Sequence, residues 1–92
     1  MYEVIVRLPA QHFIKSLNKN EQKKLLDSIN QLEKNPKLGK ELVGKLSGMR
    51  SLRVDTKQAT YRVIYKVEEL KLIVLVLQAG HREDIYSKKI GK

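Results

Sequence analysis

The chain contains no cysteine and no tryptophan, and Phe13 is its only phenylalanine. Without cysteine there is no disulfide scaffold, no thiolate metal site and no cysteine nucleophile. The longest apolar stretch, Leu72 to Leu77, is far too short to cross a bilayer. Glu3 and Arg7 interrupt the N-terminal apolar run, which therefore fits neither a signal peptide nor a membrane span. We expect a soluble cytoplasmic protein with an aliphatic core.

Positive charge is the strongest feature of the composition. Residues 1–92 are long enough for one domain, and 19 lysines and arginines against 10 acidic residues give a net charge of +9. A field of this strength favours a polyanionic partner, with nucleic acid first. Solubility alone is a simpler explanation of the charge and stays open. A membrane surface is less favoured, because the apolar faces of the helices are needed for the core.

The first half of the chain predicts one strand and two helices. Residues 2–7 alternate loosely and predict a strand, and residues 10–17 place apolar side chains on one side of a short helix. Asn18 followed three residues later by Glu21 resembles a capping box, so a second helix is expected to begin there. The glycine-rich segment 37–48 is expected to form a loop.

Three strands are predicted in the second half, over residues 51–55, 61–67 and 72–79. The middle strand alternates clearly, with its two tyrosines facing the core and Arg62 facing the opposite way. The last strand is apolar on both faces, which is typical of a central position. We therefore predict an α+β fold of order β-α-α-β-β-β, in which a helical hairpin covers one face of a mainly antiparallel sheet.

The sheet face that the helices leave free is predicted to carry the chemistry. Alternation turns Arg53 and Arg62 outward on adjacent antiparallel strands, and the last strand leads into His81, Arg82 and Tyr86. We expect these five side chains to surround one patch. Gathered like charges suit an anion, and the guanidinium fork fits a phosphate in two-point contact.

Such a patch has the groups that metal-independent RNA cleavage needs. Arginines stabilise the charge on the phosphate, and a histidine of ordinary pKa transfers protons near neutral pH. A tyrosine donates a proton or stacks on a base. With His12 and His81 as the only histidines and scattered carboxylates, no metal cluster is visible. Simpler interpretations remain for each residue alone: Arg62 as an exposed strand arginine, and His81 as a turn residue.

Two segments carry a family resemblance. LSGMRSLRVDTKQATYRVIYKV (residues 46–67) and LKLIVLVLQAGHREDIY (residues 70–86) resemble the RelE/ParE toxin superfamily, and within it the RelE branch. The shared features are a Leu-x-Gly turn, an L-R-V strand, a Y-R-V-I-Y strand and an apolar strand ending in G-H-R-x-D-I-Y. The first 45 residues match only in the layout of a strand and a helical hairpin.

The resemblance implies the toxin of a toxin–antitoxin pair that cuts messenger RNA in the ribosomal decoding site. It needs no metal or other cofactor and leaves a 2′,3′-cyclic phosphate and a 5′-hydroxyl. By position, Arg62 corresponds to the phosphate-stabilising arginine, Arg82 to the arginine after the last strand, and Tyr86 to the C-terminal tyrosine. Arg53 stands where a basic residue, often lysine, is found, and is a poor base. That leaves the identity of the general base open, and His81 is the candidate substitute.

The partners implied are a cognate antitoxin and the ribosome carrying messenger RNA, with no membrane. Four further cations are assigned to RNA binding: Arg50, Lys57, Lys66 and Lys88. Two other functions stay open, a ParE-like inhibitor of DNA gyrase and a catalytically inactive relative that binds RNA or antitoxin. The presence of Arg82 and Tyr86 after the last strand favours the ribonuclease.

Overall fold

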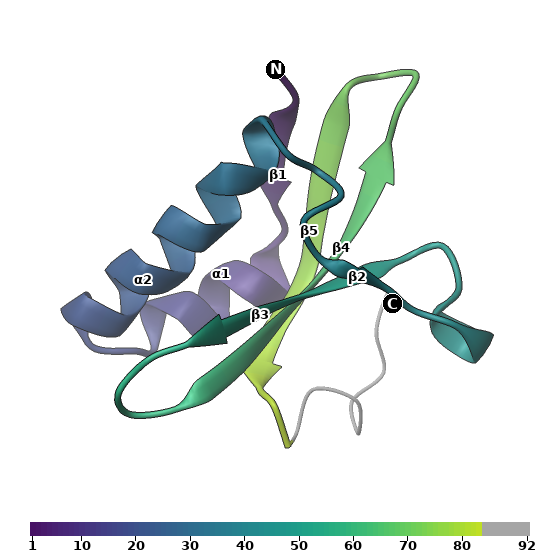
Figure 1. Ribbon diagram of the computed structural model, residues 1–92. Coiled ribbons are helices and arrows are strands. Elements are labelled where there is room, and N and C mark those ends of the chain that lie inside the picture. Colours follow the sequence, from purple (N-terminus) through teal and green to yellow (C-terminus); the bar gives the residue numbers. More distant parts are fainter. Residues whose placement is uncertain (84–92) are drawn as a thin grey trace.

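The computed structural model describes residues 1–83, which form a five-stranded sheet with two helices on one face (Figure 1). The strand order is β1-β5-β4-β3-β2, in which β1 pairs with β5 in parallel and the other neighbours are antiparallel. The elements are β1 (Glu3–Val6), α1 (Leu8–Lys15), α2 (Lys19–Asn30), the 3-10 helix η1 (Gln31–Glu33), β2 (Lys40–Glu41), the 3-10 helix η2 (Gly44–Leu46), β3 (Arg50–Asp55), β4 (Thr60–Glu68) and β5 (Ile73–His81).

Local signals explain where the helices begin. Arg7 is extended at the N-cap of α1, and Pro9 occupies its first turn, where a missing N–H costs nothing. Asn18 caps α2, since its Oδ1 accepts a hydrogen bond from the Glu21 N–H at 3.0 Å. The expected capping box is only half formed, because the Glu21 carboxylate turns into the protein and binds partners from other elements.

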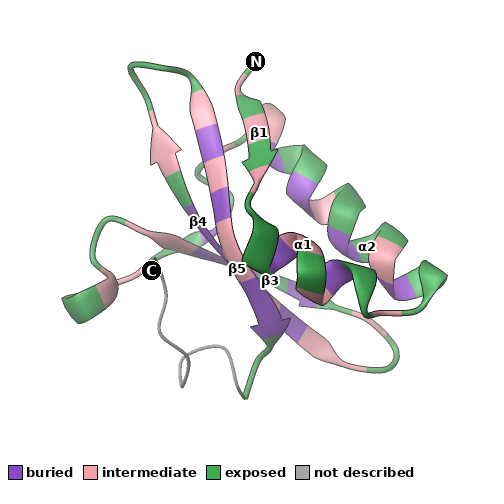
Figure 2. Ribbon diagram, turned by 180° about the vertical axis from the view of Figure 1, so that it is seen from behind, coloured by how far each residue is buried: buried purple, intermediate pink, exposed green. Residues whose placement is uncertain are grey.

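The core lies between the helices and one face of the sheet, which we call the helix face. Figure 2 shows buried residues along β4 and β5, and alternating with exposed ones along α1 and α2. Burying each large aliphatic side chain contributes about 1.5–3 kcal/mol. As predicted, the core is mainly aliphatic and takes in both β4 tyrosines: Ala10, Ile14, Leu25, Ile29, Leu32, Leu52, Val54, Tyr61, Val63, Tyr65, Val74, Val76 and Ala79.

A β-bulge in β5 resets the alternation of its side chains. Tyr65 of β4 pairs with Val76, whereas Ile64 pairs with Gln78, so that one extra β5 residue lies between them. Without the bulge, every second residue after Val76 would face the core. With it, Ala79 faces the core instead, and Gly80 lies on the opposite side of the sheet, which we call the far face.

The predicted fold class is confirmed, and β5 is central between β1 and β4 as expected. The segment predicted as a loop over residues 37–48 differs from that prediction, because it contains the two-residue strand β2, paired to β3, and the 3-10 helix η2. In Figures 1 and 2, η2 projects from the body on the side away from the helices. Among the helices of residues 1–83, none has the length and apolarity to span a membrane.

Candidate functional site

The centre of the candidate site is a pair of arginines on the far face. Arg53 of β3 and Arg62 of β4 are directly opposite each other in the strand register. Gly80 of β5 is opposite Arg62 on its other side and adds no side chain. Two like charges in directly opposed positions destabilise a sheet unless something compensates them. The prediction that these two side chains meet on this face is confirmed.

Asp55 compensates one member of the pair. The Nε of Arg53 donates to both carboxylate oxygens of Asp55 at 3.0 and 3.1 Å, and the hydroxyl of Thr60 donates to the same carboxylate at 2.9 Å. These hydrogen bonds, first from Arg53 and then from Thr60, lower the pKa of Asp55. Because the described residues engage only its Nε, the two terminal nitrogens of Arg53 remain available to an anion.

Arg62 lacks such a partner. Its Nε is buried and has no hydrogen bond, and no carboxylate of residues 1–83 forms an ion pair with it. A buried donor that lacks an acceptor destabilises the protein, and the cost is greater when the donor belongs to a charged group. This cost is several times the free energy that a typical hydrogen bond contributes. A phosphate oxygen would supply the missing acceptor in a charge-assisted hydrogen bond.

A cavity of about 370 Å³ joins both arginines to a third cation. It lies at the edge of β3 and takes Lys40 from β2, a residue that the sequence did not single out. Lys40 reaches this place because β2 pairs it with Ser51 of β3. That pairing joins segments 11 residues apart, and no local pattern in the 37–48 segment signals it. Among residues 1–83, the cavity lining includes three cations and no carboxylate.

His81 does not join the arginines. It pairs with the core residue Tyr61, and its ring centroid lies 5.1 Å from that of Tyr61 and 5.6 Å from that of Phe13 in α1. The imidazole is therefore on the helix face, and the prediction that it lies beside Arg53 and Arg62 is wrong. The bulge in β5 is the physical reason, because it moves position 81 from the far face to the helix face.

The same shift moves Arg82 in the opposite direction. Its backbone N–H donates to the carbonyl of Thr60 at 3.0 Å, which continues the pairing of β5 with β4 by one residue. By alternation, position 82 then falls on the far face together with Thr60 and Arg62. Tyr86, the remaining predicted catalytic residue, lies outside the described residues.

The cations assigned to RNA binding are distributed over different parts of the molecule. Lys66 is exposed on the far face of β4, two residues beyond Ile64, and Lys57 is exposed in the turn between β3 and β4. Arg50 faces the helix side, because it pairs with Tyr65. Lys88 lies outside the described part of the chain.

Arg50 is engaged in holding the segment before β2. Its Nη1 donates to the carbonyls of Gly39 at 2.6 Å and Lys37 at 3.3 Å, and its Nη2 contacts Glu41 at 3.1 Å. The structure therefore places Arg50 away from the arginine pair, with its charge already compensated.

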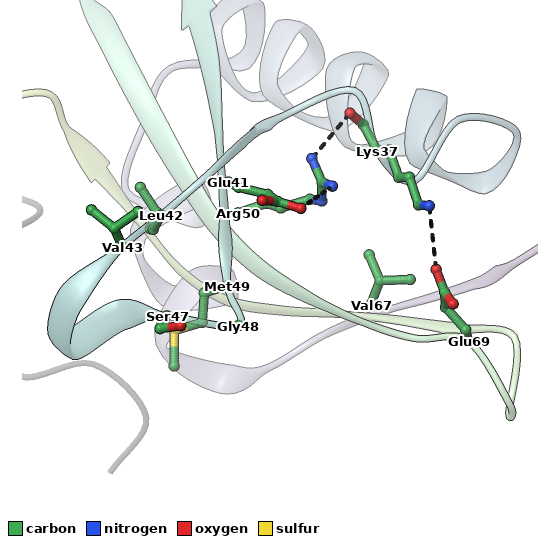
Figure 3. Close-up of a pocket in the computed structure, with 10 residues that line it drawn as sticks. All are labelled: Lys37, Glu41, Leu42, Val43, Ser47, Gly48, Met49, Arg50, Val67 and Glu69. Atoms are coloured by element: carbon green, nitrogen blue, oxygen red, sulfur yellow. Dashed lines mark hydrogen bonds and ion pairs between the residues drawn. The ribbon is translucent and has the colours of Figure 1, made fainter.

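A second cavity, of about 410 Å³, lies between the 37–50 segment and the end of β4 (Figure 3). Its charged side chains are paired with one another: Lys37 with Glu69 at 3.6 Å, and Arg50 with Glu41. This cavity is larger, but its described lining has no uncompensated charge, so it suits a phosphate less well than the cavity beside Arg62. Within residues 1–83, no three histidine, aspartate or glutamate side chains gather in a way that would hold a metal ion.

Solved structures share this fold. The toxin–antitoxin complex RelBE2 from Mycobacterium tuberculosis matches with 25% identity and a TM-score of 0.78, covering 88% of this chain and 98% of that one. A mutant Escherichia coli RelE toxin in the free state matches with 18% identity and a TM-score of 0.74, covering 94% and 90%. The archaeal RelE–RelB complex from Pyrococcus horikoshii matches with 23% identity and a TM-score of 0.64, covering 88% and 94%.

Comparison with curated protein sequences found none that matches. The model of a protein family, described as the ParE-like toxin of type II bacterial toxin–antitoxin systems, matches residues 4–89, nearly the whole chain. The strand order, the helical pair and the family match agree, and they confirm the predicted superfamily. The chain belongs to the ParE-like toxin family within the RelE/ParE superfamily of toxin–antitoxin toxins.

Proposed function

We propose that this toxin is a metal-independent endoribonuclease that cuts messenger RNA on the ribosome. The observation that carries the proposal is the state of Arg62: a half-buried guanidinium whose Nε has no partner within residues 1–83, directly opposite a second guanidinium. A phosphodiester satisfies both groups at once. Lys40 and Lys66 extend the positive surface around them.

The reaction that fits these groups is an attack by the ribose 2′-hydroxyl on the adjacent phosphorus. The new P–O2′ bond forms as the P–O5′ bond breaks, which leaves a 2′,3′-cyclic phosphate and a 5′-hydroxyl. The 2′-hydroxyl gives up one proton and the departing 5′-oxygen takes one, so the step is balanced. Arg53 and Arg62 stabilise the charge that builds up on the non-bridging oxygens. DNA lacks this internal nucleophile.

The roles of the remaining residues follow from where they lie. Arg82, at the end of β5 on the far face, is proposed to contact the same phosphate or its neighbour. Tyr86 is proposed as a proton donor or a stacking partner on the family resemblance. His81 is left out of the phosphate site, because its ring packs on Tyr61 and Phe13.

Few proton-transfer groups lie beside the arginine pair, so positioning of the substrate has to supply much of the rate. We propose that the ribosome does this, which places the protein in the cytoplasm. The toxins from M. tuberculosis, E. coli and P. horikoshii were solved in complex with their antitoxins. By analogy, we propose that an antitoxin binds this chain and controls it.

A second candidate, inhibition of DNA gyrase, is favoured by one observation: the matching family model is the ParE-like one. Controlled expression in bacteria, followed by primer extension on messenger RNA, distinguishes the candidates. The ribonuclease gives cuts in phase with codons. A gyrase inhibitor gives a DNA-damage response with intact transcripts, and a catalytically inactive relative gives neither.

A further inference from the structure

The cavity beside Arg62 has two chemically different walls. One wall is cationic and consists of Lys40, Arg53 and Arg62. The other comes from the C-terminal end of α2 and the residue after it, which contribute the neutral polar side chains of Ser28 and Gln31. A site that only held phosphate would need the first wall alone.

The floor of the cavity is an unpaired strand edge. β2 pairs with β3 only through Lys40 and Glu41, so β3 has no described partner on that side beyond Ser51. Met49 turns its carbonyl toward this edge, where it accepts from the N–H of Leu42 at 3.0 Å. Because peptide groups alternate between the two sides of a strand, Arg53 turns its own N–H and C=O toward the cavity.

The neutral wall offers free hydrogen-bonding groups. Neither the Ser28 hydroxyl nor the Gln31 amide has a partner within residues 1–83. A glutamine amide presents a donor and an acceptor side by side, which matches two adjacent groups on the edge of a base, and a serine hydroxyl can act as either. Leu38 adds an apolar flank that is 44% exposed. The volume of about 370 Å³ lies within the range of about 300–1,000 Å³ typical of small-ligand sites.

We propose that this cavity binds the nucleobase next to the phosphate held by Arg53 and Arg62, and that Gln31 and Ser28 read its edge. The inference rests on the proposed function and adds to it a base-specific subsite in single-stranded RNA. An unpaired strand edge also suits an extended peptide. The described lining has three cations and no carboxylate, and together with the net charge of +9 this favours the nucleic acid.

Equilibrium binding of fluorescent pentanucleotides tests the subsite without any cleavage. Pentamers of a single base with 2′-deoxyribose cannot be cut, and low salt keeps binding measurable. We expect the wild-type protein to prefer one base by about fivefold or more, and Gln31→Ala and Ser28→Ala each to reduce that preference. The matched control is Asn30→Ala, which removes an exposed amide from the neighbouring position, outside the cavity lining.

The two possible failures are distinguishable. Equal affinity for the four bases, or a preference that survives both Gln31→Ala and Ser28→Ala, overturns the subsite even if the wild type cuts messenger RNA. A base preference that both variants reduce, in a protein that cuts no transcript, supports the subsite and removes the proposed function. If Gln31→Ala weakens antitoxin binding and leaves base preference unchanged, the edge belongs to a protein strand and the inference is wrong.

Discussion

Arg53 and Arg62 are directly opposite each other on β3 and β4, but among the described carboxylates one holds Arg53 and none holds Arg62. Asp55 fixes the Nε of Arg53, whereas the Nε of Arg62 is buried and has no hydrogen-bond partner in the described part of the chain. One guanidinium is therefore oriented and the other has unused hydrogen-bonding capacity. This asymmetry favours an anion bound between them and predicts different consequences for substitutions at each position.

Removing Arg62 should strongly reduce activity without destabilising the fold. We expect Arg62→Ala to slow cleavage by about 10²–10³-fold, because a preorganised donor to the developing charge is lost. Its midpoint of thermal unfolding should stay the same or rise, because a repulsive pair and an unpartnered buried donor disappear. Primer extension and thermal denaturation measure the two effects.

The control for Arg62→Ala is Lys45→Ala, which removes the same charge from the exposed η2. It should cut like the wild type. Normal cleavage by Arg62→Ala would contradict the assignment of the phosphate site.

Removing Asp55 should separate RNA binding from cleavage. Asp55→Asn raises the net charge by one beside the phosphate site, so RNA affinity should rise by a few fold. Cleavage should fall by about tenfold, because Arg53 is no longer oriented. Glu69→Gln, which also removes an exposed carboxylate from an ion pair, is the control and should change neither.

The effect of Asp55→Asn should not depend on pH between 5 and 8. The pKa of Asp55 is already lowered from its ordinary value. Above the ordinary pKa of an aspartate, the ion pair between Asp55 and Arg53 is therefore fully formed, and it is lost only as pH falls through the lowered pKa. A pH-dependent ratio of wild-type to variant rates in this range would show that Asp55 has another role.

The phenol of Tyr61 should remain protonated in alkaline solution. Burial and the hydrogen bond to Glu21 at 2.9 Å raise the pKa of Tyr61 to about 12, above the ordinary value of 10. Because the pKa of Tyr61 is higher in the folded protein than in the unfolded chain, the protonated phenol contributes to the stability of the fold. That contribution is complete below pH 10 and is lost as pH rises toward 12. Phenolate absorbance during titration measures it, and Tyr61→Phe should remove one late-titrating group while leaving Tyr65, whose pKa is also raised by burial. Ionisation of every tyrosine near pH 10 would contradict the buried contact.

Adding a methyl group at Gly39 should destabilise the segment that carries Lys40. A Cβ at this position would lie 2.8 Å from the Tyr65 ring and hydroxyl and 2.9 Å from the Ser51 carbonyl. We expect Gly39→Ala to lower the free energy of unfolding by about 1–3 kcal/mol, measured with urea. Tyr65→Phe removes the hydrogen bonds to Gly39 and Pro36 without adding bulk, and should cost about 1–3 kcal/mol. Wild-type stability in both variants would contradict the close packing.

Much of the fold and half of the site can be predicted from local patterns. Alternation in residues 61–67 correctly separates the core tyrosines from Arg62, and the same rule places Arg53 beside it. These predictions succeed because side-chain direction along a regular strand depends only on the backbone of that strand. The apolar stripe and the Asn18 cap identify α2 for the same local reason.

The remaining features depend on pairings between distant segments. A single extra residue in β5, opposite Ile64 and Tyr65, exchanges the faces of His81 and Arg82. Two residues of β2 bring Lys40 to the arginine pair, and the buried Glu21 finds its partners in Thr56 and Tyr61, 35 and 40 residues away. Register and bulges are set by how the whole sheet and its helices pack, because strand pairing is chosen by contacts that no single segment contains. Periodicity therefore placed the two arginines, and only the assembled sheet placed the groups around them.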